Sequence, residues 1–379
     1  MRPSPFKLEA FFEEFEFVPD MYVLGSSDAQ TLSVEELLAM SDKPLSLAEI
    51  PLSYQDVKGD ESLRAAVAEM YKPANVTTEN ILITTGASEA IFLSLHALLD
   101  PGDEALVCRP VFQSVSEVAQ MAGATVRFYD YIEQDEFQPD LASVHKAIAE
   151  DFRPKLLFIN TPHNPTGRAM DEATLTVLLR EAEAAEVAVL VNEMYSGVWL
   201  PPTLPVPSAI TLNTKVIVIA GLSKVFGLAG LRIGWLVGPA DFIQTCKSLR
   251  YYTSLCPPAI LQKLGEIAVR NREKILERTR RVVHTNYETA LKWLSAHEKF
   301  FDWVRPDGGQ AMLVRLKSEM ETELFARELA LKAAVLLIPC TTCFDMEHGY
   351  LRLGLGGEPS RFGEGLARLS DFLRVPGCV

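Results

Sequence analysis

Short apolar runs rich in β-branched residues alternate with amphipathic helical patterns between about residue 80 and residue 240 of this chain. The runs predict buried strands and the patterns between them predict helices. This alternation favours an α/β fold with a mostly parallel sheet that helices cover on both faces. In such sheets the active site lies at the carboxyl ends of the strands. The predicted strands are Ile81–Thr85, Ala105–Cys108, Thr125–Phe128, Leu156–Asn160, Val187–Asn192, Lys215–Ala220 and Trp235–Val237, and the predicted helices include Ala87–Leu99, Leu141–Ala149 and Asp171–Ala185.

The remainder of the chain predicts a second, smaller domain. A long helical pattern runs from Pro257 to His297, and the stretch from Phe301 to Leu373 mixes strand and helix patterns, as is typical of an α+β domain. With 379 residues the chain is long enough for two cores. We therefore expect an N-terminal arm that forms part of the small domain (residues 1–45), a large domain (46–270) and a C-terminal small domain (271–379).

Composition narrows the possible partners. The formal net charge is −14 at pH 7, which disfavours nucleic acid and anionic membranes and is compatible with a cationic substrate. We find no signal-peptide pattern and no apolar run as long as a membrane span. Six scattered cysteines fit a reducing cytoplasm. The pair Cys340 and Cys343 lacks the second pair or the histidines of a zinc site, so we expect no metal.

A lone lysine follows the apolar strand that ends at Ala220. Lys224 is followed eight positions later by Arg232, and small residues lie between them. Desolvation and nearby cations lower the pKa of a lysine, and a neutral amine can form a Schiff base with an aldehyde. The planar guanidinium of an arginine suits a phosphate. Together they indicate pyridoxal 5'-phosphate (PLP) as the cofactor; the alternative is a surface lysine in a Gly-rich loop.

A second candidate phosphate site lies at residues 86–88. Gly86, Ala87 and Ser88 follow a predicted strand and open a predicted helix. The backbone N–H groups at a helix N-terminus, together with the Ser88 hydroxyl, can bind a phosphate. An ordinary strand–helix turn capped by Ser88 is an equally simple interpretation.

The order of the motifs resembles the class I and II aminotransferases, which are PLP enzymes of fold-type I with an aspartate-aminotransferase-like fold. This resemblance extends over roughly Pro51 to Leu373. An N-P-x-G signature with Asn164 lies in Asn160–Gly167, and an Asn-Glu-x-Tyr segment, where the family has Asp-Glu-x-Tyr, lies in Val191–Tyr195. The lysine motif is Ser223–Arg232, and an arginine in an apolar run lies in Tyr350–Gly354.

The resemblance implies a role for each matching residue. Lys224 becomes the Schiff-base lysine and the general acid and base, and Arg352 binds the α-carboxylate of an amino acid substrate. Tyr54 reaches the phosphate of the partner subunit, which implies a homodimer with shared active sites. The remaining cofactor-binding residues are the phosphate ligands Gly86, Ala87, Ser88, Ser223 and Arg232, the ring-stacking Phe112, and Asn164 and Tyr195 on the phenolic oxygen.

Asn192 is the main departure from the family pattern. The family usually has an aspartate there, whose charge keeps the pyridine nitrogen protonated and makes the ring a strong electron sink. An asparagine can hydrogen-bond this nitrogen but adds no charge. We therefore expect a weaker sink, or compensation by another group.

The arm and the lysine motif together are more similar to a narrower group, the capreomycidine synthases, which cyclise a hydroxylated arginine. They are still more similar to the cyclodehydratases that convert γ-hydroxy-L-arginine to L-enduracididine in guanitoxin biosynthesis. A site for a guanidinium group should offer carboxylates. Glu9 and Asp28 are the candidates for that role, with Ser26 and Ser27 as hydroxyl partners.

Several functions stay open at this point. The first is cyclodehydration of γ-hydroxyarginine, and a β-hydroxyarginine cyclase is its close variant. The second is a conventional aminotransferase that needs a 2-oxo acid. The third is a non-enzymatic regulator, which the presence of Lys224, Asn164, Tyr195, Arg232 and Arg352 disfavours.

Overall fold

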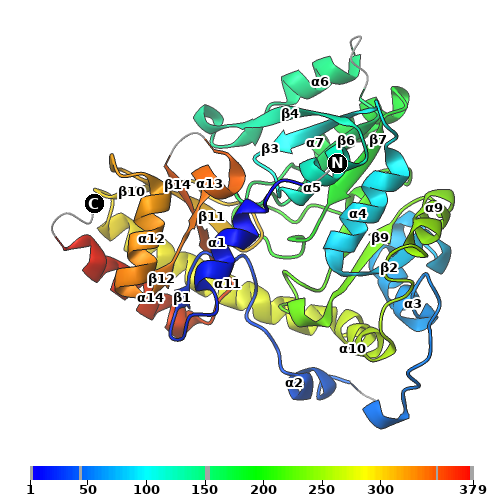
Figure 1. Cartoon of the computed structure of the whole chain (residues 1–379), viewed down its shortest axis with the longest axis horizontal. Helices are drawn as coiled ribbons and strands as arrows, with labels where there is room; N and C mark the ends of the chain where they lie inside the picture. The colour runs from blue at the N-terminus through cyan, green and yellow to red at the C-terminus, as the bar shows by residue number, and fades with distance from the viewer. Residues whose placement is uncertain (1–2, 42–44, 150–153, 347–348, 376–379) are drawn as a thin grey trace.

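The computed structural model describes residues 3–41, 45–149, 154–346 and 349–375, and its largest feature is an eight-stranded sheet (Figure 1). The strand order is β2 (Ile81–Thr85), β9 (Ile233–Val237), β8 (Ile217–Gly221), β7 (Ala188–Asn192), β6 (Leu156–Asn160), β3 (Glu104–Arg109), β4 (Thr125–Ile132) and β5 (Gln138–Pro139). The central strands from β8 to β4 run parallel, whereas β2, β9 and β5 pair antiparallel at the two edges. The carboxyl ends of β6 and β7 therefore meet at one edge, where Asn160 pairs with Asn192.

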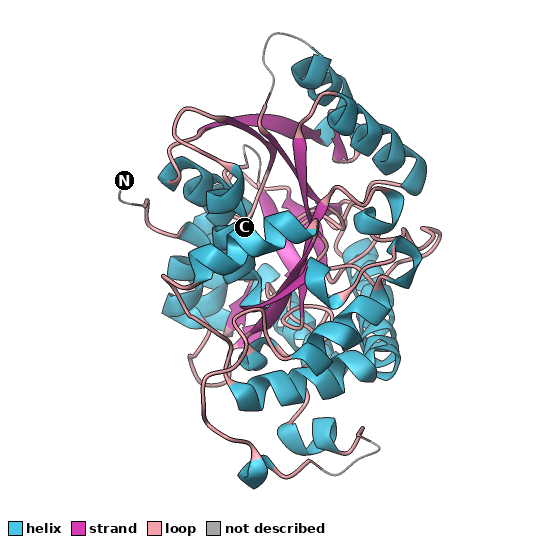
Figure 2. Cartoon of the chain, turned by 90° about the vertical axis from the view of Figure 1, so that its right-hand side faces the viewer, coloured by secondary structure: helices cyan, strands magenta, loops and turns pink. Residues whose placement is uncertain are grey.

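Helices lie on both sides of this sheet (Figure 2). They are α3 (Glu61–Met70), α4 (Gly86–Leu98), α5 (Ser114–Met121), α6 (Leu141–Ala149), α7 (Glu172–Ala184), α8 (Ala209–Leu212), α9 (Ala240–Arg250) and α10 (Ala259–Arg270). In one group of helices α4 packs against α5 and α9, and in a second group α7 packs against α6 and α8. The 3-10 turns are η1 (Leu47–Glu49), η2 (Lys72–Ala74), η3 (Thr78–Asn80), η4 (Glu133–Asp135) and η5 (Ala229–Leu231).

The predicted α/β architecture is confirmed, and all seven predicted strands form in the one sheet. Their boundaries shift most at β4, which runs past its predicted end at Phe128. Tyr129 and Tyr131 extend it because they are 1% and 5% exposed, and alternate residues of a strand point to the same face. The long helical pattern after Pro257 divides into two helices at Asn271.

The second sheet has four antiparallel strands and forms the core of a smaller α+β unit, as predicted. Its order is β10 (Phe301–Trp303), β11 (Ala311–Leu316), β14 (Tyr350–Gly354) and β13 (Ile338–Pro339). The helices α11 (Arg272–Ala296), α12 (Thr322–Ala333), α13 (Cys340–Phe344) and α14 (Pro359–Leu373) accompany it. In the described ranges no helix is both long and apolar enough to cross a membrane.

The N-terminal arm connects the two sheets. It contains α1 (Lys7–Phe15), β1 (Tyr22–Val23) and α2 (Val34–Leu38), and β1 pairs in parallel with β12 (Val335–Leu336). Figure 1 shows α1 between the two parts of the molecule: it contacts α13, and the Lys7 N–H donates to Gln113 Oε1 at 2.9 Å. Further along, the arm packs against the loop that follows Lys224. This packing is close, since a Cβ on Gly227 would lie 2.6 Å from the Gln30 carbonyl oxygen. The arm is thus placed to form one wall of a site.

Candidate active site

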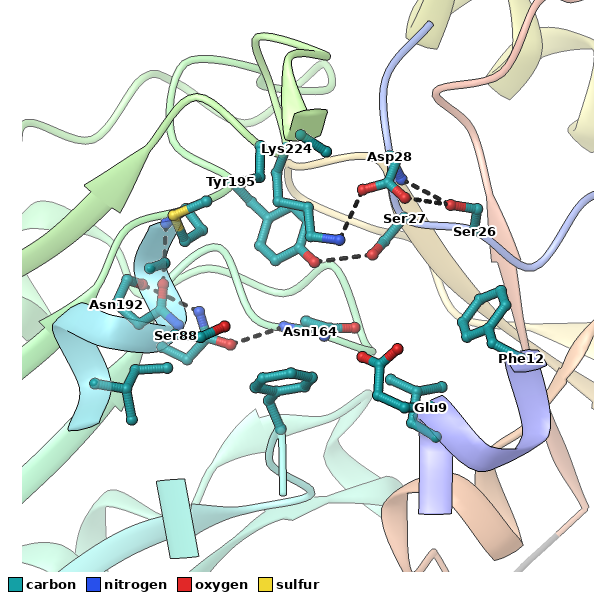
Figure 3. A pocket seen from close by; sticks show the side chains of 18 of the residues that line it. Glu9, Phe12, Ser26, Ser27, Asp28, Ser88, Asn164, Asn192, Tyr195 and Lys224 are labelled. Atoms are coloured by element: carbon teal, nitrogen blue, oxygen red, sulfur yellow. Dashed lines mark hydrogen bonds and ion pairs between the residues drawn. The ribbon is translucent and has the colours of Figure 1, made fainter. Parts of the chain in front are cut away.

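A cavity of about 370 Å³ lies between the carboxyl ends of the central strands and the N-terminal arm (Figure 3). It holds every residue predicted for the site except Gly86, which borders it, and Tyr54. The lining residues are Leu8, Glu9, Phe12, Glu16, Ser26, Ser27, Asp28, Ala87, Ser88, Ile91, Phe112, Asn160, Asn164, Asn192, Met194, Tyr195, Ser223, Lys224, Ala229, Arg232 and Arg352. Residues far apart in sequence therefore converge as the motif order predicted.

Lys224 forms an ion pair with Asp28 across the cavity. The Lys224 Nζ lies 2.7 Å from Asp28 Oδ1, and the Ser26 hydroxyl donates to Asp28 Oδ2 at 2.8 Å. Burial alone would lower the pKa of Lys224, but the neighbouring Tyr195 and Asp28 outweigh burial and the Arg352 charge and raise that pKa above its usual value. The lowering expected from desolvation and nearby cations is thus wrong for the cofactor-free protein, because a carboxylate from the arm adjoins the amine.

The Asp28 carboxylate is correspondingly stabilised in its charged form. Burial raises its pKa, but the charge and the hydrogen bond of Lys224, the Ser26 hydroxyl and the Arg352 charge together lower it below the usual range. The side chains of Lys224 and Asp28 are 30% and 41% exposed, so both still face the open cavity. Both pKa directions therefore place the proton on the Lys224 amine, as an ion pair at the centre of the site.

The N-terminus of α4 forms the candidate phosphate site. Among the described residues no side chain caps α4, so the interpretation of a turn capped by Ser88 is not supported, and the first N–H groups of the helix are suited to an anion. Gly86 has φ +73°, where other residues are strained, and a Cβ there would lie 2.5 Å from Arg232 Nη2 and displace the guanidinium. The guanidinium and the helix end are thus packed directly together.

A buried ion pair fixes the start of α4. The Glu89 carboxylate accepts the Thr85 N–H at 2.6 Å and pairs with Arg250 Nη2 at 3.0 Å, and Arg250 is fully buried. Because a buried charge is costly unless it is paired, this contact constrains where the helix begins. Arg250 and Glu89 are supporting residues that sequence reasoning did not identify.

Asn164 and Tyr195 present polar atoms to the centre of the cavity. Asn164 Oδ1 accepts from Arg352 Nη1 at 3.0 Å, which leaves the Asn164 NH₂ group as a donor. The hydroxyls of Tyr195 and Ser27 are 2.9 Å apart. Two donors suited to an oxyanion therefore line the same cavity as the Lys224 amine, as the family resemblance implies for the phenolic oxygen.

Arg352 is positioned on β14 of the smaller sheet. It is 2% exposed, its Nε donates to the Gly25 carbonyl at 3.0 Å, and its guanidinium lies 5.4 Å from the centre of the Phe344 ring. A guanidinium oriented in this way can offer a planar pair of donors to a carboxylate. The neighbouring Cys340 and Cys343 are buried, and burial raises both thiol pKa values, that of Cys343 to about 12, which does not favour thiol chemistry.

His163 supports the Asn164 loop without facing the cavity. Its ring bonds Thr166 Oγ1 at 2.8 Å and the Pro110 carbonyl at 2.9 Å, and it stacks on Tyr131 with the ring centres 3.8 Å apart. Burial lowers the His163 pKa to about 4, so the ring is neutral at pH 7. It connects Asn164 to the chain that carries Phe112, which lines the cavity.

The structure adds a third carboxylate, Glu16, that sequence reasoning missed. Glu9, Phe12 and Glu16 all line the cavity from α1 and its C-terminal end. Their spacing of three and four residues was the available signal, since it places all three on one helix face. Burial and repulsion by Asp28 and Glu9 raise the pKa of Glu16, despite the opposing effect of Lys224. Ile91, Asn160, Met194 and Ala229 are further lining residues that were not predicted.

Tyr54 is the predicted residue that the single chain does not bring to the cavity. It is 84% exposed, as is Leu52 two positions before it. Its expected partner is a second subunit, so its position in one chain does not test that prediction.

Comparison with known proteins gives a family and several relatives. The sequence pattern of the family described as Aminotransferase class I and II matches residues 19–369. The capreomycidine synthase of Streptomyces vinaceus is 29% identical over 354 residues, which cover 92% of this chain and 89% of that protein.

Two solved structures have the same fold over nearly the whole chain. A PLP-dependent aminotransferase from Streptococcus suis has a TM-score of 0.90 and 28% identity, and the match covers 99% of this chain and 98% of the other. The PLP-dependent cyclase OrfR has a TM-score of 0.88 and 28% identity with the same coverage. The fold is thus shared by an aminotransferase and a cyclase.

Proposed function

The chain belongs to the class I and II aminotransferase family, and from that premise we propose that it is a PLP-dependent cyclodehydratase that converts γ-hydroxy-L-arginine to L-enduracididine. Its likeness to capreomycidine synthase and to the cyclase OrfR supports cyclisation as the reaction class. The acidic cavity wall supports a substrate with a guanidinium group, and the γ position of the hydroxyl comes from the sequence resemblance alone.

The observation that carries the proposal is the acidic wall. Glu9, Glu16 and Asp28 all come from the arm and line the same cavity as Lys224 and Arg352. Carboxylates form strong bidentate hydrogen bonds with guanidinium groups, and Arg352 suits the carboxylate at the other end of an amino acid. Burial, together with repulsion by Asp28 and Glu9, raises the pKa of Glu16, and a guanidinium in the cavity would relieve that repulsion. The cavity thus matches a substrate with one acidic and one strongly basic end.

The residues of the opposite wall fit PLP. The uncapped N-terminus of α4 and Arg232 offer donors to its phosphate, and Asn164 and Tyr195 offer donors to its phenolic oxygen. Phe112 lies where a ring could stack, and Lys224 supplies the amine. When bound, PLP accepts the electron pair that a departing proton leaves at the substrate Cα.

The proposed reaction needs no oxidant and no oxo acid. Protons leave Cα and Cβ and later return; the bond from Cγ to its hydroxyl breaks, and a guanidine nitrogen bonds to Cγ to close a five-membered ring. The hydroxyl leaves with one guanidine proton, so the substrate loses one water in total.

Lys224 is the candidate for the proton transfers, and Asp28 positions it. The Lys224 amine is the candidate base at Cα, and its ion pair with Asp28 at 2.7 Å holds the protonated amine at the centre of the cavity. Arg352 holds the carboxylate end while the acidic wall holds the guanidinium end. This fixes the guanidine nitrogens near Cγ, which favours ring closure over release.

The main competing function is a conventional aminotransferase, which the likeness to the Streptococcus suis enzyme favours. A mass-spectrometric assay in deuterated water distinguishes the two. The PLP-loaded protein is given γ-hydroxy-L-arginine without any oxo acid. Loss of one water with deuterium at Cα and Cβ is the expected result. No reaction until an oxo acid is added, followed by appearance of its amino acid, would contradict the proposal.

The β-hydroxyarginine cyclase is tested in the same assay with the β-hydroxy isomer. That substrate would lose water from Cβ and close a six-membered ring. We expect little product from it. A faster reaction than with the γ-hydroxy substrate would assign the protein to that variant.

We also propose that the active unit is a homodimer with shared sites, in which Tyr54 reaches the partner's phosphate site. The high exposure of Tyr54 supports this. Mixing inactive Lys224→Ala subunits with Tyr54→Phe subunits should restore activity, because one site of each hybrid dimer then has both residues. If mixing leaves the activity at the sum of the two separate variants, Tyr54 does not act across the dimer.

A further inference from the structure

The amide orientation of Asn192 is fixed by the backbone. Asn192 is the last residue of β7 and is 8% exposed. Its Oδ1 accepts the N–H of Met194 at 3.1 Å. Its own carbonyl accepts the Thr161 N–H at 3.1 Å and Asn160 Nδ2 at 3.0 Å, so the residue is held on both sides.

This contact decides which end of the amide faces the cavity. A flipped amide would place its NH₂ group against the Met194 N–H and leave two donors in contact without an acceptor, which is costly in a buried site. Asn192 lines the cavity, and its Nδ2 has no hydrogen-bond partner within the described ranges. The group presented to the cavity is therefore a donor with two N–H bonds.

We propose that Asn192 Nδ2 donates a hydrogen bond to the ring nitrogen of bound PLP and thereby keeps that nitrogen unprotonated. A nitrogen that accepts this bond uses its lone pair and cannot carry a proton at the same time. The inference depends on the cofactor of the family and not on the identity of the substrate.

In the part of the chain that the structure describes, no other carboxylate is placed to replace the missing aspartate. The cavity-lining carboxylates Glu9, Glu16 and Asp28 belong to the arm, and Figure 3 shows Glu9 and Asp28 on the side of the cavity opposite Asn192. The next residue, Glu193, does not line the cavity; its carboxylate accepts the Ala209 N–H at 2.7 Å, and burial raises its pKa to about 7. The ring nitrogen would thus meet a neutral donor at this wall.

The consequence concerns how long the cofactor ring retains electrons from the substrate. A ring without the extra proton holds them less strongly, so a proton should return to the substrate sooner. The structure thereby accounts for the Asn192 departure without a compensating charge.

The test is the ¹⁵N NMR signal of the ring nitrogen in protein loaded with ¹⁵N-labelled PLP, without substrate. We expect the chemical shift of an unprotonated pyridine in the native protein and that of a protonated pyridinium in Asn192→Asp. The aspartate can still accept the Met194 N–H with one oxygen while the other faces the ring.

Glu193→Gln is the matched control, and its signal should stay at the native position. A pyridinium shift in the native protein would overturn the proposal, even if Asn192→Asp failed to fold. The proposal would also be overturned if Asn192→Asp gave the ¹⁵N chemical shift of an unprotonated pyridine, or if Glu193→Gln changed the ¹⁵N chemical shift. Because no substrate is present, these outcomes are independent of the proposed cyclodehydration.

Discussion

The two walls of the cavity are built in different ways. The inner wall consists of strand ends and a helix N-terminus, where Asn192, Lys224 and the start of α4 are held by the large sheet. The outer wall consists of the arm: Glu9 lies on a nine-residue helix, Glu16 lies at its C-terminal end, and Asp28 follows β1. The inner wall carries groups suited to a cofactor, and the outer wall carries groups suited to a cation. Substitutions in the inner wall should therefore alter mainly the reaction, and substitutions in the outer wall should alter mainly the choice of substrate.

Lys224→Ala should have the largest effect, because it removes the amine of the inner wall. We expect turnover of any amino acid to fall by about 10³-fold or more, since both the nucleophile and the general base are lost. The measurement is turnover together with the mass of the borohydride-reduced protein, which should no longer carry covalent cofactor. Lys292→Ala, at an exposed position of α11, is the control and should behave as the native protein. If Lys224→Ala still carries covalent cofactor, another residue is the nucleophile.

Gly86→Ala should act on the cofactor and on every substrate alike. A methyl group there meets the Arg232 guanidinium at φ +73°, so we expect PLP affinity to fall by roughly 10- to 100-fold, in line with a strain of about 1–2 kcal/mol plus the lost contact. Fluorescence titration of the cofactor-free protein measures the affinity. Unchanged PLP affinity would show that the N-terminus of α4 does not bind the phosphate.

Asp28 connects the two walls through its ion pair with Lys224. Asp28→Asn should speed covalent attachment of the cofactor and slow turnover of a cationic substrate. Without the carboxylate, the pKa of Lys224 should fall, because Asp28 is one of the groups that raise it. Since only the neutral amine reacts with the cofactor, the pH profile of covalent attachment should move to lower pH. Turnover of a cationic substrate should nevertheless fall by about 10- to 100-fold through loss of a charged hydrogen bond. Stopped-flow absorbance measures the attachment rate at each pH. An unshifted profile would show that Asp28 does not control the amine.

Glu16→Gln and Glu9→Ala should affect only cationic substrates, and by the smallest amounts. We expect KM for γ-hydroxy-L-arginine to rise by about 10-fold in each, which is the scale of one charge-assisted hydrogen bond. The control is Glu13→Gln, an exposed glutamate of the same helix that does not line the cavity. Kinetics with a neutral amino acid should be unchanged in all three. If turnover of the cationic substrate is unchanged in Glu9→Ala, Glu9 has no part in substrate binding.

Much of the inner wall could be predicted because its groups follow local rules. Asn164 follows β6 and Asn192 ends β7, and parallel strands bring their carboxyl ends together, so the order of the motifs was enough to place them in the same site. The outer wall was harder to predict. Glu9 and Asp28 were identified from resemblance. Glu16 was missed although its spacing from Glu9 and Phe12 places it on the same helix face, because that spacing alone does not tell whether the face lines a cavity or meets solvent.

Periodicity and the residues next to strand ends were enough to predict the α/β fold, the smaller α+β unit and the order of the cofactor-binding motifs. The charge state of Lys224 and the orientation of the Asn192 amide became visible only in the folded chain. Both depend on contacts across the fold or around a turn: Asp28 lies 2.7 Å from an amine that is 196 positions away, and the Met194 N–H directs one amide oxygen. Electrostatic interactions depend on distance in space, and separation along the chain does not reveal that distance.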